Sequence, residues 1–143
     1  MRAIPSPALW LGLSGLIPFV ALAAASLAGP APWDARALAG LTGYGATILA
    51  FMGGCRWGFA AAGLGAGPRW TALALSVVPS LWAWVALALP HPWSLAMLAA
   101  GLAFLYLADV VLTAQGGAPG WWPALRRPLT LVACLSLAAA MAA

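Results

Sequence analysis

Long apolar stretches, separated by short segments rich in glycine, proline and polar residues, dominate the pattern along this chain. They predict helices at about residues 7–28, 35–63, 70–89, 93–115 and 121–142. A run of about 20 apolar residues has the length that an α-helix needs to cross a membrane. The pattern therefore predicts an all-α membrane protein, a five-transmembrane-helix bundle that forms a single integral membrane domain over residues 1–143.

The first stretch contains Pro18, which removes the hydrogen bond to the carbonyl group of Ser14, so we expect a kink there. A cleaved signal peptide is the alternative, because Arg2 precedes the apolar run and the small residues 23–28 end it. The apolar run is about 20 residues long, which fits a membrane span better than the core of a signal peptide.

Small side chains recur along the second stretch at steps of three or four residues. They are Gly43, Thr47, Ala50, Gly54, Gly58 and Ala62. Gly54 and Gly58 form a GxxxG pair, which predicts that another helix packs closely against this face. Arg56 projects about 200° away from Gly54, on nearly the opposite side. The second helix is therefore expected to have neighbours on two faces and to lie centrally.

Apart from Arg36 at the start of the second stretch, Arg56 and Asp109 are the charged residues inside the apolar stretches before the last one. A charge at membrane depth costs at least a few kcal/mol, so it normally meets a partner inside the protein. Both residues lie six or seven positions before the predicted ends of their helices, about 10 Å deep. Matched depth and opposite charge predict a salt bridge. In the alternative, Arg56 extends to the headgroups while Asp109 bonds Tyr106 or Thr113.

Further polar and aromatic residues could belong to the same polar site as Arg56 and Asp109. Trp57 could cover the Arg56 guanidinium in a cation–π contact or face lipid instead. Ser76 and Ser80 flank Pro79 on the third helix, where they could satisfy backbone groups that the proline frees or present polar groups to a ligand. The candidate polar site is therefore Arg56, Asp109, Tyr106, Trp57, Ser76 and Ser80.

Composition supports a membrane protein and excludes several other classes. The chain is 65% hydrophobic and 6% charged, with a mean hydropathy of +1.01, which leaves too little polar surface for a water-soluble globule. Its net charge of +4 comes from scattered arginines, so no nucleic-acid patch is predicted. Cys55 and Cys134 lie in apolar stretches without a CxxC motif or a Cys/His cluster, and we expect no metal and no cofactor.

The distribution of arginines predicts an orientation. With five spans, one side collects Arg2, Arg69, Arg126 and Arg127, and the other side collects Arg36. Because cytoplasmic loops carry the excess of positive residues, we expect the N-terminus in the cytoplasm and the C-terminus in the periplasm of a bacterial inner membrane. The Arg126–Arg127 pair is expected at headgroup level. His91, between two prolines, is expected in an exposed turn.

Several phrases resemble those of a known family. They are GLIPF at 15–19, YGATILAFMGG at 44–54, RWG at 56–58, SVVPSLWAW at 76–84, Asp109, and WWPALRRPLT at 121–130. In this order they resemble the transmembrane protein 69 family, small bacterial and mitochondrial membrane proteins grouped under a domain of unknown function. The resemblance places Arg56 where relatives usually carry histidine and Trp122 where they usually carry tyrosine. Arginine does not titrate near neutral pH, so a proton-transfer role at that position is not expected here.

Three function classes follow from the sequence. The first is a non-enzymatic inner-membrane protein that acts as an accessory or assembly partner of a larger membrane complex, with membrane lipids and a membrane-protein partner or second copy as its contacts. The alternative is binding or transport of a small anionic or lipid-like ligand at an intramembrane Arg56/Asp109 site. An enzyme is disfavoured, because the sequence has no HExxH, no Ser–His–Asp set, no phosphate loop and no paired carboxylates.

Overall fold

The computed structural model describes residues 3–65 and 67–143, and in this part of the chain the regular structure is entirely helical. The helices are α1 (Ser6–Ser14), α2 (Leu16–Ala28), α3 (Trp33–Ala61), α4 (Arg69–Leu87), α5 (Trp93–Ala114) and α6 (Trp122–Ala140). The predicted boundaries are correct to within about three residues. Arg2, which entered the predicted orientation and the signal-peptide alternative, lies outside the described residues.

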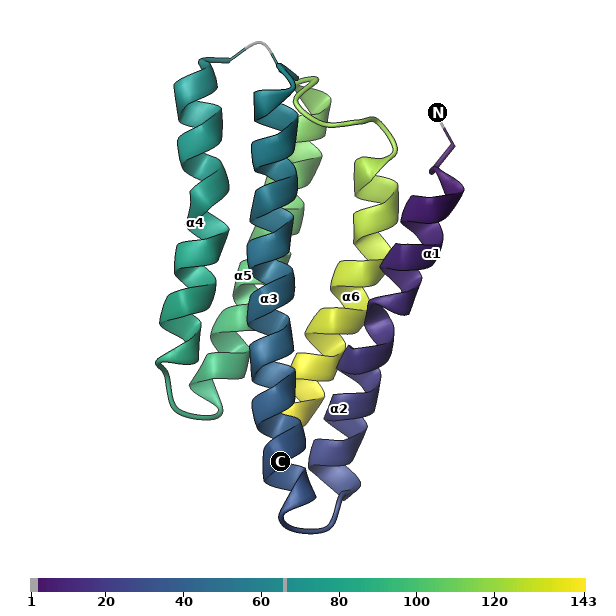
Figure 1. Ribbon diagram of the computed structural model, residues 1–143, viewed down its shortest axis with the longest axis vertical. Coiled ribbons are helices and arrows are strands. Elements are labelled where there is room, and N and C mark those ends of the chain that lie inside the picture. Colours follow the sequence, from purple (N-terminus) through teal and green to yellow (C-terminus); the bar gives the residue numbers. More distant parts are fainter. Residues whose placement is uncertain (1–2, 66) are drawn as a thin grey trace.

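The helices run side by side along the long axis of the molecule (Figure 1). α1 and α2 together form the segment Ser6–Ala28, and each later helix runs back in the opposite direction. The start of α1 therefore lies at the same end of the bundle as the C-terminal ends of α3 and α5, while the chain finishes toward the other end. This arrangement gathers the C-terminal ends of α3 and α5 and the beginning of α6 into one region.

Four segments within the described residues are long and apolar enough to cross a membrane: Ser6–Ala28, Trp33–Ala61, Arg69–Leu87 and Trp93–Ala114. α6 is not among them, because Arg126, Arg127 and Pro128 lower the hydropathy of its first turns. Large apolar side chains such as Trp10, Trp84 and Phe104 point outward, as lipid-facing residues do. The chain is an all-α membrane bundle.

The break between α1 and α2 lies at Gly15, three residues before Pro18 and next to the predicted freed carbonyl of Ser14. The hydroxyl group of Tyr44 on α3 donates a 2.8 Å hydrogen bond to the carbonyl oxygen of Gly15. The ring of Tyr44 also packs edge-on against Phe19, with the ring centroids 5.0 Å apart. This contact fixes the position of the break against α3.

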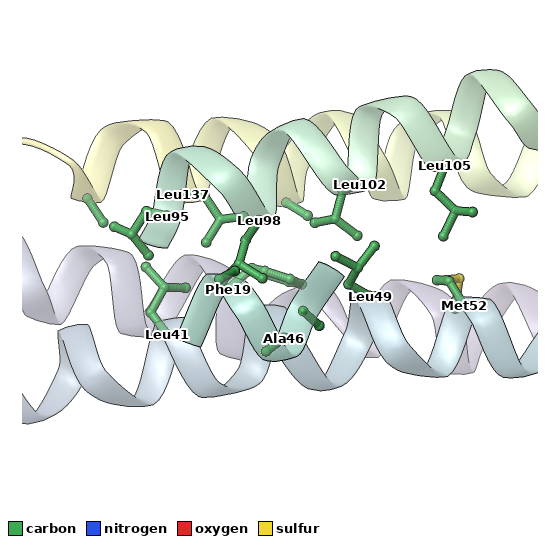
Figure 2. Packing of buried hydrophobic residues seen from close by; sticks show 14 of the residues in the cluster. Phe19, Leu41, Ala46, Leu49, Met52, Leu95, Leu98, Leu102, Leu105 and Leu137 are labelled. Carbon is green, nitrogen blue, oxygen red and sulfur yellow. The ribbon is translucent and has the colours of Figure 1, made fainter. Parts of the chain in front are cut away.

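Leucines fill the centre of the bundle (Figure 2). Leu41 and Leu49 on α3 point toward Leu95 and Leu102 on α5, and all four are buried, as is Phe19 from α2. Lipid chains are about as apolar as leucine, so in a membrane it is the close fit of such side chains that holds the helices together. The interlocked leucines therefore set the spacing between α3 and α5.

α3 and α4 lie close together at Gly53 and not at the predicted GxxxG pair. A Cβ atom on Gly53 would lie 2.7 Å from the carbonyl oxygen of Ser76 and 3.2 Å from Cβ of Pro79. At Gly54 and Gly58 it would meet no atom within 4 Å. The prediction of helix packing at Gly54 and Gly58 is wrong for this chain alone, because their face of α3 points away from the other helices.

A second close contact lies at Gly101 on α5. A Cβ atom there would lie 2.7 Å from both Leu49 Cδ2 and Trp82 Nε1. The indole N–H of Trp82 donates a 2.7 Å hydrogen bond to the carbonyl oxygen of Met97. Gly101 therefore makes room for the tryptophan that joins α4 to α5.

Candidate functional site

Asp109 on α5 is the centre of the buried polar cluster, with 0% of its surface exposed. The Nη1 atom of Arg56 on α3 lies 2.9 Å from its Oδ1 atom, so the predicted ion pair is confirmed. Arg56 precedes Ala61 by five residues and Asp109 precedes Ala114 by five, the last residues of α3 and α5. At 1.5 Å per residue both lie about 7.5 Å from the helix ends, and this equal depth lets them meet.

Two residues of α6 hold the second oxygen of the carboxylate. The indole N–H of Trp122 donates to Asp109 Oδ2 over 3.0 Å, and Nε of Arg126 donates to the same oxygen over 3.2 Å. Trp122 and Arg126 are four residues apart, so they lie on one face of the helix. The single carboxylate therefore joins α3, α5 and α6.

The cluster carries more positive than negative charge. Arg56 and Arg126 contribute two positive charges and Asp109 one negative charge, so the sum is +1. Arg126 is only 3% exposed, and Arg56 is 12% exposed. The sequence predicted a neutral pair. The second arginine on the same buried aspartate gives the cluster a net positive charge instead.

Aromatic rings enclose the cluster on the side of α6. The ring of Trp122 packs edge-on against Phe59, with the ring centroids 5.1 Å apart, and against Trp121 at 5.9 Å. The guanidinium carbon of Arg126 lies 6.0 Å from the centroid of the Trp122 ring, at the limit of a cation–π contact. These rings keep the hydrogen bonds of Asp109 apart from lipid and solvent.

A cavity of about 390 Å³ lies on the α6 side of the cluster, between α1, α2, α3 and α6. Its lining includes Arg126 and Thr130, one turn apart on α6. Nη2 of Arg126 and Oγ1 of Thr130 are buried and have no hydrogen-bond partner among the described residues. Buried donors without a partner are rare in proteins, so they mark this cavity as a place for a polar atom.

A second cavity, of about 710 Å³, lies on the other side of the cluster, between α3, α4, α5 and the connection around Gly65. Arg56 contributes to its wall, together with Thr71 and Gln115. Arg56 uses Nη1 for Asp109, which leaves its other N–H groups for this cavity. The two arginines on Asp109 therefore face two different cavities.

The other predicted site residues stay outside the cluster. Tyr106 is half-buried and is not among the donors to the Asp109 carboxylate, and the hydroxyl of Thr113 donates to the Asp109 backbone carbonyl instead. Trp57 is 48% exposed, which corresponds to its lipid-facing alternative. Asp109 is therefore bound by arginines and Trp122 and not by the hydroxyl groups of its own helix.

The two serines of α4 do not reach Arg56. Ser76 is buried against α3, and its hydroxyl donates a 2.6 Å hydrogen bond to the carbonyl of Leu73, while Ser80 is exposed. Their assignment to the polar site is wrong, because the close contact at Gly53 turns Ser76 toward the backbone of α3 and leaves Ser80 outside.

Trp122 and Arg126 are the site residues that sequence reasoning missed. The adjacent Arg126 and Arg127 resembled a pair of headgroup anchors, yet Arg127 is exposed and Arg126 is buried. Successive residues of a helix differ by about 100° in direction, so one of two adjacent arginines can face inward. The i,i+4 spacing of Trp122 and Arg126 was the available signal.

The described residues contain no group of three or more His, Cys, Asp and Glu side chains that could hold a metal ion. Cys55 contributes to the wall of the 390 Å³ cavity, and the thiol of Cys134 contacts the carbonyl oxygen of Ala99 at 3.4 Å. The chemistry that this arrangement can perform is recognition of negative charge and of hydrogen-bond acceptors.

Comparison with known proteins identifies a family and two similar proteins. Residues 4–142 match the family described as "Protein of unknown function (DUF3429)". Transmembrane protein 69 of Xenopus tropicalis is 40% identical over 142 residues, which cover 96% of this chain and 54% of the relative. Transmembrane protein 69 of Mus musculus is 36% identical over 135 residues, 92% of this chain and 54% of the relative. The chain thus spans about half the length of these relatives. No solved structure matches it.

Proposed function

The chain belongs to the DUF3429 family of proteins of unknown function, and on that premise we propose that it is a non-enzymatic membrane protein that binds a small anionic or lipid-like ligand at Asp109, Arg56 and Arg126. The observation that carries this proposal is the net charge of +1 in a buried cluster that lies between two cavities. A buried charge without a counter-charge is costly, so an anion that reaches it is bound favourably.

The size and lining of the cavities support a small amphiphilic ligand. Their volumes of about 390 and 710 Å³ fall within the range of roughly 300–1,000 Å³ that is usual for small-molecule sites. Most of their wall residues are apolar, and an arginine is present in each. A ligand with an acidic head and an apolar body suits this combination.

A role as accessory or assembly partner, or as a homo-oligomer, is the second candidate. The outward face of α3 favours it: Gly43, Gly54 and Gly58 have no neighbour within 4 Å of an added Cβ, and Phe51 and Trp57 beside them are exposed. Small outward residues let the helix of another protein approach closely in a membrane. In this candidate the polar cluster serves only to hold α3, α5 and α6 together.

For the cellular setting we propose a bacterial inner membrane, with the cluster near the cytoplasmic face. Arg69 and Arg127 are exposed at the end of the bundle that contains the cluster, and Arg36 lies near the opposite end. The excess of arginines at one end supports that orientation through the positive-inside rule. The cluster would then lie near the anionic lipids of that leaflet.

Purification in a mild nonionic detergent, followed by mass spectrometry of bound small molecules and proteins, separates the two candidates. We expect an anionic amphiphile to copurify at a molar ratio near 1:1 with the parent protein and with Arg127→Gln. The double variant Arg56→Gln/Arg126→Gln should lose this bound molecule. Arg127→Gln is the matched control, because it removes an exposed arginine beside the buried one. A stoichiometric protein partner without any bound anion would favour the accessory role and contradict ligand binding.

A further inference from the structure

We propose, on the basis of the ligand-binding function above, that the 390 Å³ cavity binds a single-chain carboxylate amphiphile of the fatty-acid class. Its carboxylate would accept hydrogen bonds from Nη2 of Arg126 and Oγ1 of Thr130, the two buried donors without a partner. This assigns a specific ligand class and a specific cavity to the general anion-binding role.

The polar end of the cavity presents buried donors to a hydrogen-bond acceptor. Arg126 is 3% exposed and Thr130 is 7% exposed, so water outside the bundle does not satisfy their free N–H and O–H groups. Nε of Arg126 is fixed on Asp109 Oδ2, and the ring of Trp122 lies beside its guanidinium group. The free Nη2 atom is thereby held in place by the same contact that orients the side chain.

The remaining wall of the cavity is apolar and suits an alkyl chain. Leu11 from α1, Phe19 from α2, and Ile48 and Met52 from α3 contribute to it. Figure 1 shows α1 and α2 lying alongside α6, and the residues that line the cavity come from these helices and from α3. An alkyl chain in this cavity would contact these apolar side chains.

The charge of the cluster favours a carboxylate as the head. The cluster of Arg56, Arg126 and Asp109 sums to +1, so a single negative charge neutralises it. Nη2 of Arg126 and Oγ1 of Thr130 each donate to an oxygen of the carboxylate, and the bond from the guanidinium group is of the strong kind, between two ionised groups. A phosphate head carries up to two negative charges at neutral pH, and the second would exceed the single positive charge of the cluster.

The test uses the full chain in nonionic detergent after lipids have been removed. Radiolabelled oleate, methyl oleate and lauryl phosphate are titrated separately at a pH well above the pKa of a carboxyl group. The informative variant is Thr130→Val, which removes the hydroxyl group at nearly constant volume. Thr47→Val is the matched control, because the Thr47 side chain is exposed and its hydroxyl bonds its own helix at the Gly43 carbonyl.

We expect oleate to bind the parent and Thr47→Val equally, and Thr130→Val about tenfold more weakly, as the loss of a hydrogen bond to a charged group predicts. Methyl oleate should bind the parent at least about tenfold more weakly than oleate for the same reason. Without oleate, Thr130→Val should be as stable as the parent or more so, because it removes a buried hydroxyl that has no partner. The thermal stabilisation by oleate should be smaller in Thr130→Val than in the parent.

Equal oleate affinity in Thr130→Val and the parent would overturn the proposal. If oleate binding were instead lost only in Arg56→Gln, anion binding at the cluster would stand but this cavity would be the wrong one. Binding of lauryl phosphate, but not oleate, with the same dependence on Thr130 would refute the carboxylate class. Absence of saturable binding of any of these anions to the parent would refute both this inference and the anion-binding function.

Discussion

Substitutions at Asp109 and its two arginines test whether the cluster is one coupled unit. Asp109→Leu removes the acceptor of three hydrogen bonds and leaves Arg56 and Arg126 inside the bundle without a counter-charge. Breaking a buried ion pair from one side costs about 3–5 kcal/mol of unfolding free energy. Because two guanidinium groups lose their partner together, we expect a loss at the upper end of that range.

The arginine variants should be less severe and unequal. In Arg56→Met, Asp109 keeps Trp122 and Arg126, and the excess positive charge disappears. We expect a loss of about 1.5 kcal/mol, the low end for a hydrogen bond between charged groups. The double variant Arg56→Met/Asp109→Leu should stay about 3 kcal/mol below the parent, because Arg126, at 3% exposure, still has no counter-charge.

The triple variant, with Arg126→Met added, distinguishes the coupled cluster from a simple pair. Replacing a whole buried ionic group with apolar residues is often nearly neutral, so we expect recovery to within about 1 kcal/mol of the parent, the remainder being the Trp122 N–H that has lost its acceptor. Unfolding free energies come from reversible titration with SDS in mixed micelles, followed by circular dichroism. Arg127→Met is the control and should stay within about 0.5 kcal/mol. Full recovery in the double variant would show that Arg126 does not depend on Asp109, and the reasoning would fail.

Three further predictions use the same unfolding titration. Gly53→Leu should destabilise the bundle by at least about 1–3 kcal/mol, because its Cβ would lie 2.7 Å from the carbonyl oxygen of Ser76, whereas Gly54→Leu should be near neutral; equal effects would disprove the assigned facing of α3. Trp122→Phe keeps a ring against Phe59 but loses the hydrogen bond to Asp109, for an expected cost of about 1–3 kcal/mol; a change below 0.5 kcal/mol, roughly the limit for a surface substitution, would contradict that bond. Tyr44→Phe should cost about 1 kcal/mol, because the Gly15 carbonyl loses its hydroxyl donor; no loss would mean that the break needs no such donor.

Sequence alone was enough to predict the helices and the Arg56–Asp109 pair, and the reason is physical in each case. Apolar length decides where a span can lie, and the cost of a buried charge decides that two opposite charges at one depth meet. The prediction from the GxxxG pair was wrong because the motif indicates small side chains and does not indicate that another helix lies next to them. Gly53, next in sequence to Gly54, makes the close contact instead.

Arg126 could not be placed by counting charges along the chain, because its direction depends on which face of α6 is buried. Arg127, its neighbour, is exposed and fits a headgroup anchor, while Arg126 turns about 100° away toward Asp109. The inward face of α6 also carries Trp122 and Thr130, each four residues from Arg126. That face therefore carries Trp122, which donates a hydrogen bond to Asp109, and Thr130, which lines an apolar cavity. The extra arginine changes a neutral structural pair into a positively charged site, so the cluster has a physical reason to attract an anion as well as to hold the helices together.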